Sequence, residues 1–163
     1  MSNQSEMVKQ FTEGSSGTPC PDKPIEMSRD SVFYLIRMVM SELDELANTV
    51  CQNEMESIAL MREALDKIDV CHSFPTNPVS RIAAQADAMV DANYYMLNVA
   101  AKHGMNLSRL FDIVHDANMA KRDPITNQFI RRQSDGKVMK PAGWKEPDID
   151  GEIARQIREG SWK

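Results

Sequence analysis

The chain has 163 residues and a formal net charge of −5 at pH 7, which allows one domain with its own hydrophobic core. The acidic balance argues against nonspecific binding to nucleic acid or to an anionic membrane as the main role. No apolar run approaches the roughly 20 residues that a membrane-spanning helix needs, and the polar first residues lack the regions of a signal peptide. We therefore expect a cytoplasmic protein without a nucleic acid or membrane partner.

The chain contains three cysteines, Cys20, Cys51 and Cys71. They are odd in number, widely spaced and without a Cys-x-x-Cys pair, so they predict neither a disulfide framework nor a zinc site. We expect free thiols in a reducing compartment.

Helical patterns account for most of the chain. A short helix is expected near residues 4–13, followed by a segment rich in glycine and proline up to about residue 30. Apolar residues spaced three and four apart then predict three long helices, over about residues 29–50, 53–70 and 80–103. Asn106 or Ser108 can cap a further helix. The helix over residues 80–103 is apolar on two sides, so we expect it to be buried nearly all round.

The composition changes after Lys121. Residues 122–148 mix basic residues with Asp, Gly and Pro, which predicts a loop with a turn at residues 134–137. A short polar helix is expected over about residues 148–159. The whole succession favours a single all-α domain, a helical bundle, over residues 1–163.

Three parts of this domain are expected, namely an N-terminal helix with an irregular segment (1–30), a helical core with acidic motifs (31–121) and a basic loop with a short C-terminal helix (122–163). The apolar helices are too few to enclose all their own apolar faces. We therefore expect a homodimer at least, with a larger oligomer left open.

Two acidic pairs are the most informative residues. Glu42 and Glu45 lie three apart, and Asp87 and Asp91 lie four apart, so each pair occupies one side of a helix. If the two helices pack together, four carboxylates can converge, and such a cluster needs a cation. Mg²⁺ or Mn²⁺ suits these oxygen ligands, and a site of this kind commonly holds and activates a phosphate ester or anhydride. Ordinary surface charge is the alternative reading of the same pairs.

Basic residues follow the acidic helices along the chain. They are Lys121, Arg122, Arg131, Arg132, Lys137 and Lys140. Lys and Arg are what a polyphosphate needs once metal ions have neutralised part of its charge, although any one of these residues can also be plain surface. Asn118 shares a helical side with Lys121. Glycine-rich phosphate loops and Glu-x-x-His pairs are absent from the sequence, which argues against P-loop, dinucleotide-binding and di-iron proteins.

Four stretches of the sequence resemble a known family. Residues 35–46, LIRMVMSELDEL, are similar to the first acidic motif of the MazG-like, all-α nucleoside triphosphate pyrophosphohydrolases. The later stretches resemble the phosphoribosyl-ATP pyrophosphohydrolase-like branch of that superfamily; they are residues 86–95 (ADAMVDANYY), 114–121 (VHDANMAK) and 135–141 (DGKVMKP). The last two runs, in this order, are distinctive. The resemblance covers about residues 30–147.

The resemblance implies a MazG-like four-helix core in a homo-oligomer. It also implies Mg²⁺-dependent cleavage between the α and β phosphates of a nucleotide, which releases pyrophosphate and a nucleoside monophosphate. Glu42 and Glu45 match the Glu-x-x-Glu metal ligands of the family, and Asp91 matches the Asp that ends its Glu-x-x-Asp motif.

The basic residues are carried over in the same way. Asn118 and Lys121 match the Asn and Lys of the run that we infer to meet phosphate. Lys137 and Lys140 match the basic pair of the later loop. The resemblance therefore implies that these four side chains bind the phosphates of the substrate.

The second acidic motif departs from the family pattern. Ala88 occupies its Glu position, and the nearest acid, Asp87, lies one residue earlier, which is a rotation of about 100° on a helix. The spacing of four between Asp87 and Asp91 recovers part of this alignment. Ser41 replaces an acid often found before the Glu-x-x-Glu, and residues 51–79 form a longer segment than in compact relatives. The number of metal ions and the identity of the base therefore stay open.

We predict a nucleotide pyrophosphohydrolase that uses Mg²⁺, with Mn²⁺ as a substitute. The metal ligands would be Glu42, Glu45, Asp87 and Asp91. One of the two glutamates, Glu45 in preference to Glu42, would help to activate the attacking water. The substrate phosphates would be bound by Asn118, Lys121, Lys137 and Lys140.

Two other readings stay open. One is a helical interaction module of the same fold without efficient catalysis, which Ala88 favours. The other is a phosphoribosyl-ATP pyrophosphohydrolase of histidine biosynthesis. Helical periodicity does not fix the shape of a nucleotide pocket, so the preferred base and sugar do not follow from the sequence.

Overall fold

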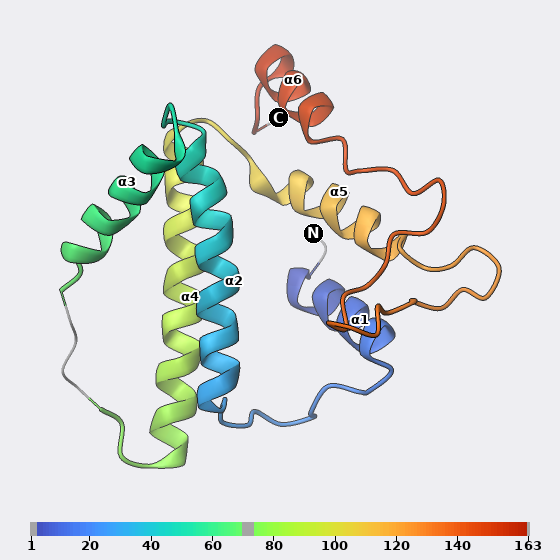
Figure 1. Ribbon diagram of the computed structural model, residues 1–163, viewed down its shortest axis with the longest axis horizontal. Helices are drawn as coiled ribbons and strands as arrows, with labels where there is room; N and C mark the ends of the chain where they lie inside the picture. Colours follow the sequence, from blue (N-terminus) through green and yellow to red (C-terminus); the bar gives the residue numbers. More distant parts are fainter. Residues whose placement is uncertain (1–2, 70–73, 163) are drawn as a thin grey trace. The chain divides into compact units, whose positions relative to one another are not determined.

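A computed structural model of the chain describes residues 3–69 and 74–162 (Figure 1). Within these residues the backbone forms six α-helices, together with isolated antiparallel bridges at Arg122–Phe129 and Arg131–Val138. The expected all-α class is confirmed. The described chain groups into two compact units, Pro24–Met89 and the combination of Met1–Lys23 with Val90–Lys163, and each is treated by itself below. The single domain stays a prediction.

The unit over residues 24–89 contains α2 (Arg29–Asn48), α3 (Glu54–Asp66) and the first part of α4 (Pro78–Lys102). Side-chain caps set where α2 and α3 begin. The Ser28 hydroxyl accepts a hydrogen bond from the Ser31 amide, and the side-chain oxygen of Asn53 accepts one from the Glu56 amide. The helix expected over residues 53–70 ends at Asp66, and Val70 lies outside the described residues.

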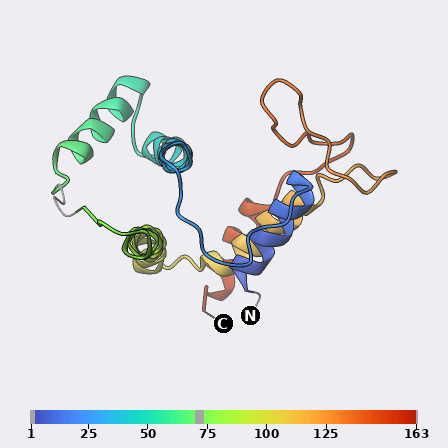
Figure 2. The same ribbon diagram turned by 90° about the horizontal axis from the view of Figure 1, so that it is seen from below.

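Two sets of contacts hold this unit together. α2 packs against α3, as Figure 2 shows from below. Just before α2, the backbone amide of Met27 donates to the side-chain oxygen of Gln85 on α4 at 2.9 Å. The side-chain nitrogen of Gln85 donates in turn to the Met27 carbonyl at 3.2 Å. Glu26 forms an ion pair with Arg81 of α4 at 2.6 Å. The chain that leads into α2 is thereby fixed to the first turns of α4.

The other unit contains α1 (Gln4–Ser16), α5 (Leu107–Met119), α6 (Ile149–Glu159) and the rest of α4. α5 packs against both α1 and α6. Asn106 caps α5, one of the two residues that the sequence allowed for this role. The side-chain amide of Gln156 on α6 bonds both the amide and the carbonyl of Asn106, each at 2.9 Å. The start of α5 is therefore fixed to α6.

Glu152 of α6 is buried and makes several charged contacts. Its carboxylate pairs with Arg155 at 2.7 Å and Arg109 at 3.1 Å, and it accepts a hydrogen bond from Gln156 at 3.0 Å. The Arg155 hydrogen bonds, with help from Gln156 and the nearby Arg109 charge, lower the pKa of this carboxyl group to about 2. Glu152 therefore stays ionised at neutral pH and links α6 to α5.

Residues 122–148 form the expected loop, and its two turns are anchored on α1. The turn predicted at residues 134–137 is confirmed: the amide of Gly136, at φ 69°, donates to Arg132, and the Arg132 amide donates to Lys137. The ring of Phe129 meets Phe11 of α1 edge-on at 5.3 Å. Arg131 donates to the Ser15 carbonyl at 2.5 Å. These contacts fix the loop on the surface of α1.

Among the described residues the buried apolar ones are few, namely Ala47, Ala100 and Leu110. The prediction that the helix over residues 80–103 is buried nearly all round is wrong for the single chain, because Val90, Tyr94 and Tyr95 are 65 to 70% exposed. Periodicity identifies an apolar face but does not say what covers it.

Two further expectations concern thiols and membranes. Cys20 and Cys51 are free thiols, as expected, and Cys71 lies outside the described residues. Among the described helices none has the length and apolar character to cross a membrane.

Candidate active site

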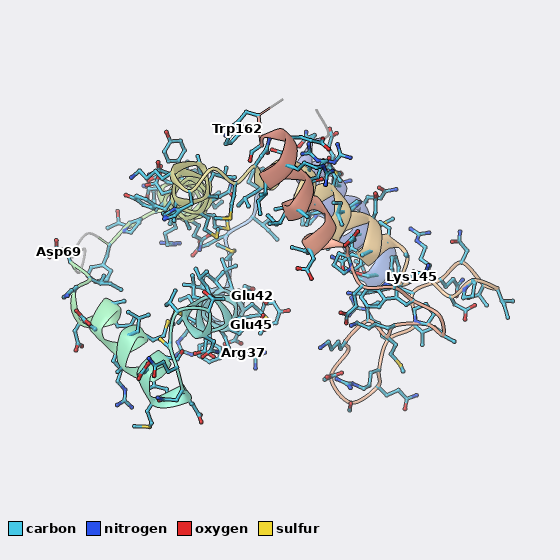
Figure 3. The ribbon with its side chains drawn as sticks, turned by 90° about the horizontal axis from the view of Figure 1, so that it is seen from above. Arg37, Glu42, Glu45, Asp69, Lys145 and Trp162 are labelled. Atoms are coloured by element: carbon cyan, nitrogen blue, oxygen red, sulfur yellow. The ribbon has the colours of Figure 1, made fainter. Side chains whose placement is uncertain are left out.

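Glu42 and Glu45 project from the same side of α2 (Figure 3), and both are exposed. Within the described residues neither carboxylate forms a hydrogen bond or an ion pair. Asp44, between them, has a different role. It accepts a hydrogen bond at 3.0 Å from the hydroxyl of Ser57, the most buried side chain on α3, and so ties α2 to α3. The structure thus separates one structural carboxylate from two unpaired ones.

Asp87 and Asp91 lie one turn apart on α4 with Ala88 between them, and both are exposed. Over residues 3–69 and 74–162, no group of three or more His, Cys, Asp and Glu side chains lies close enough to hold a metal ion. Asp87 belongs to the same unit as Glu42 and Glu45, whereas Asp91 belongs to the other unit. The assignment of the four residues as metal ligands stays a prediction.

The unpaired carboxylates of α2 still suit Mg²⁺. This ion keeps several waters and is usually held by one or two carboxylates together with phosphate oxygens of the substrate. Glu42 and Glu45 supply two such carboxylates on one helical side, and no basic side chain competes for them in the described chain. A cluster of three protein ligands is therefore not needed for the ion to bind.

The predicted phosphate-binding residues gather around the C-terminal end of α5. The Lys121 ammonium donates to the Asn118 side-chain oxygen at 2.6 Å and lies 5.5 Å from the centre of the Trp144 ring. The Lys140 ammonium lies 4.1 Å from the same centre. Both distances are within the range of a cation–π interaction. We call Lys121, Lys137, Lys140 and Trp144 the lysine cluster.

The charges of this cluster act on one another. Partial burial, followed by repulsion from Lys140 and Lys137, lowers the pKa of the Lys121 ammonium group. None of the ion pairs between described residues includes Lys121 or Lys137, and the exposed Glu146 lies 3.4 Å from Lys140. The cluster is therefore a concentration of positive charge with little compensation.

Trp144 was not among the residues selected from the sequence. Its indole N–H donates to the Ala117 carbonyl at 2.7 Å, so the ring is fixed against the end of α5. A sequence signal was present, because Trp144 is a single aromatic residue among Lys137, Lys140 and Lys145 in a polar loop. Aromatic rings interleaved with basic residues are a pattern of anion and nucleotide sites.

The three arginines of the basic region have local roles. Arg122 lies over the ring of Phe129 at 4.9 Å, Arg131 donates to the α1 backbone and Arg132 pairs with Asp135. Each side chain therefore stabilises the loop. The arginines therefore contribute to the loop, whereas the lysines gather around Trp144.

An apolar pocket lies beside Asn118, between α1 and α5. It is lined by Val8, Phe11, Phe111, Val114, His115 and Asn118. His115 is buried there, and Asn118 connects the pocket to Lys121 through its hydrogen bond. His115, Asn118 and Lys121, all from residues 114–121, therefore lie close together at the pocket and the end of α5.

The helices and their acidic and basic motifs define an all-α protein with the MazG-like fold. A family model described as phosphoribosyl-ATP pyrophosphohydrolase matches residues 6–118, and the chain belongs to this family. Among solved structures the chain is similar to "a putative NTP pyrophosphohydrolase" from Exiguobacterium sp. 255-15. The TM-score is 0.85 and the sequence identity 34%, over 97% of this chain and 98% of that chain. No curated protein is significantly similar to it.

Proposed function

We propose that the protein is a Mg²⁺-dependent nucleotide pyrophosphohydrolase that cleaves the α–β phosphoanhydride of a nucleoside triphosphate or related nucleotide. The products are a nucleoside monophosphate and pyrophosphate. Family membership and the similar structure support a pyrophosphohydrolase at the general level. The observation that carries the finer proposal is the pair of unpaired carboxylates at Glu42 and Glu45, which suit a metal ion. The lysine cluster, in the other unit, is the second kind of group that a polyphosphate substrate needs.

The residues would divide the work by charge. Glu42, Glu45, Asp87 and Asp91 are the candidate metal ligands. When bound, Mg²⁺ would neutralise and orient phosphate oxygens. Glu45, in preference to Glu42, would accept the proton of the attacking water. Its exposed carboxylate on α2 has no other partner in the described chain, which leaves it free to do so.

The lysine cluster and Asn118 would receive the phosphates. Lys121, Lys137 and Lys140 would bind the β and γ phosphates and stabilise the charge that develops on the leaving pyrophosphate. Asn118 would hold Lys121 in place through the hydrogen bond at 2.6 Å. These roles require protonated ammonium groups, so phosphate binding should weaken in alkaline solution.

We also propose a homo-oligomer. In one unit α2 exposes Phe33 and Tyr34, and in the other α4 exposes Val90, Tyr94 and Tyr95, each more than half exposed; exposed apolar groups of this kind mark an interaction site. A second copy of the chain would cover these faces, and it could supply carboxylates that a single chain does not bring together. We expect a cytoplasmic location for such a nucleotide-processing enzyme.

The matching family model keeps phosphoribosyl-ATP as a second candidate substrate. The test is product analysis after incubation with canonical and modified nucleoside triphosphates and with phosphoribosyl-ATP, each with Mg²⁺. Monophosphate plus pyrophosphate from a triphosphate, lost in Glu45→Gln, is the expected result. Turnover of phosphoribosyl-ATP alone would move the protein to histidine biosynthesis.

A helical interaction module without catalysis is the rival from another class, and Ala88 in the second acidic motif favours it. Metal dependence of the melting temperature separates the two readings. A ligand that binds only the folded state must stabilise it, so a working site predicts a higher melting temperature with millimolar Mg²⁺ and nucleotide. An unchanged melting temperature, combined with no turnover of any substrate, would support the module.

A further inference from the structure

Trp144 has no role in the proposed chemistry, yet its ring is the centre of the lysine cluster. The Lys121 and Lys140 ammonium nitrogens lie 5.5 and 4.1 Å from the ring centre. The two lysines are separated along the chain by a loop with two turns, and both ammonium groups lie over this indole. Each cation is attracted by the negative face of the ring, and this attraction opposes their mutual repulsion.

The indole is itself fixed from two directions. Its N–H donates to the Ala117 carbonyl at 2.7 Å, at the end of α5. The Trp144 backbone amide donates to the Pro141 carbonyl at 3.1 Å and closes a turn in which Gly143 has a φ of 78°. A side chain at Gly143 would strain this turn, since L residues rarely adopt such a φ. The ring is therefore placed by the backbone before any ligand arrives.

Without this template, the lysines would have a different arrangement. Long ammonium side chains normally extend into water, where hydration and repulsion keep like charges apart. Lys121 is instead partly buried near Lys140 and Lys137. Burial and the repulsion of these two charges disfavour its protonated form and lower its pKa. The exposed carboxylate of Glu146, 3.4 Å from Lys140, is a weak and replaceable counter-ion.

We propose that Trp144 is a positioning residue that holds Lys121 and Lys140 together so that they bind a diphosphate group, the pyrophosphate end of the substrate. The identity of this anion rests on the proposed function. Two ammonium groups beside one ring match a ligand whose negative charge is spread over two phosphorus centres. Pyrophosphate carries more negative charge than orthophosphate at the same pH, so it gains more from two ammonium groups. Trp144 should therefore matter more for pyrophosphate than for orthophosphate.

Direct binding of inorganic pyrophosphate, without Mg²⁺ and without turnover, tests this role. The chain contains two tryptophans, so Trp162→Phe leaves Trp144 as the single indole reporter. Trp162 is exposed and makes no contact with the cluster's lysines among the described residues. We expect a saturable change in Trp144 emission on titration with pyrophosphate. No change at any concentration would overturn the inference.

Calorimetric titration of Trp144→Leu then measures the effect of removing the ring. We expect pyrophosphate binding to weaken by about tenfold or more and orthophosphate binding to change far less. Trp144→Phe keeps an aromatic face, so it should recover most of the lost affinity. Equal affinity of Trp144→Leu and the parent for pyrophosphate, or an equal loss for both anions, would contradict the proposal.

Gly143→Ala provides an independent variant if Trp144→Leu fails to fold, as judged by its helical circular dichroism. The added methyl group meets no other atom within 4 Å, so it strains the turn without filling space near the lysines. The preference for pyrophosphate over orthophosphate should fall in this variant too. An unchanged preference for pyrophosphate in Gly143→Ala would overturn the inference.

The outcome is separable from that of the proposed function. Pyrophosphate binding that depends on Trp144, in a protein that hydrolyses no nucleotide, would leave the positioning role intact and reject the enzyme. Nucleotide hydrolysis combined with pyrophosphate binding that does not depend on Trp144 would support the enzyme and reject the positioning role.

Discussion

The acidic pair on α2 and the lysine cluster after α5 solve the same electrostatic problem in different ways. Like charges are brought close together in both regions. Glu42 and Glu45 are held by helix geometry alone, with exposed and unpaired carboxylates. Lys121 and Lys140 are instead drawn onto one indole, with Lys121 further held by Asn118.

The difference follows from the length of the side chains and from what each region would bind. Glutamates three apart on a rigid helix need no further positioning, and their repulsion is relieved when a cation binds. Lysines on a loop have flexible side chains of four carbons and need a template to stay together. The acidic pair therefore needs no further ordering before a metal ion binds. The lysines, in contrast, must be held together by the protein before the anion binds.

Glu45→Gln should have the largest effect of the changes considered. If Glu45 accepts the proton of the attacking water, the variant should lose about 10²- to 10⁴-fold in kcat with helical content unchanged. A pyrophosphate-release assay measures the loss. Glu54→Gln, which removes an exposed carboxylate of α3, is the matched control. Similar rates for the two variants would remove Glu45 from the chemistry.

Lys121→Met should rank second. A charge-assisted hydrogen bond contributes about 1.5 to 3 kcal/mol, so its loss should weaken substrate or pyrophosphate binding by about 10- to 100-fold. Lys145→Met removes a lysine of the same loop that lies outside the cluster, and its binding should match the parent. Equal losses of affinity in the two variants would mean that the lysines act only through the general positive charge of the loop.

The fall of pyrophosphate affinity at alkaline pH should also depend on Lys121. Since the pKa of Lys121 is lowered, its ammonium group loses its proton at a lower pH than an ordinary lysine. Affinity should therefore begin to fall below pH 10.5, the ordinary value, as calorimetry at a series of pH values can show. A fall that is identical in Lys121→Met would assign it to another group.

Glu152 offers a carboxylate that already has its partners, in contrast to Glu42 and Glu45. Its pKa in the folded protein is about 2, below the ordinary 4.5. Its contribution to stability is therefore complete above pH 4.5 and is lost as the pH falls toward 2. Melting temperatures of the parent and Glu152→Gln should differ at pH 6 and converge toward pH 2. A constant difference would show that the ion pairs with Arg109 and Arg155 are not responsible.

Ser57→Ala should have the smallest effect. It removes the buried hydroxyl that donates to Asp44, and a neutral donor to a carboxylate at the edge of solvent contributes about 1 kcal/mol. Urea unfolding measures this loss, and kcat should stay at the parental value. A fall in kcat under conditions in which the variant is fully folded would mean that the α2–α3 contact also orients Glu42 and Glu45.

The helices could be predicted from the sequence because their signals are local. Ser28, Asn53, Asn106 and Asp148 each place a capping side chain at a helix start, and apolar periodicity supplies the rest. The turn near Gly136 was equally accessible. Spacings of three and four also placed each acidic pair on one helical side correctly.

What could not be predicted depends on contacts between distant residues. The sequence does not show that Asp44, rather than Glu42 or Glu45, bonds to α3, because all three are acids on one helix. Periodicity favoured burial of α4, yet Tyr94 and Tyr95 are exposed in the single chain. Trp144 was not selected because its place beside the lysines depends on where the loop returns to α5.

The exposed apolar side chains of α2 and α4 bear on stability if the chain associates with itself, as we propose. If association covers Phe33 and Tyr94, the free energy of folding includes the free energy of that association. The melting temperature would then rise with protein concentration. If the proposed activity also needs this association, dilution would lower the activity, and the cellular abundance of the chain would then limit it as the supply of substrate does.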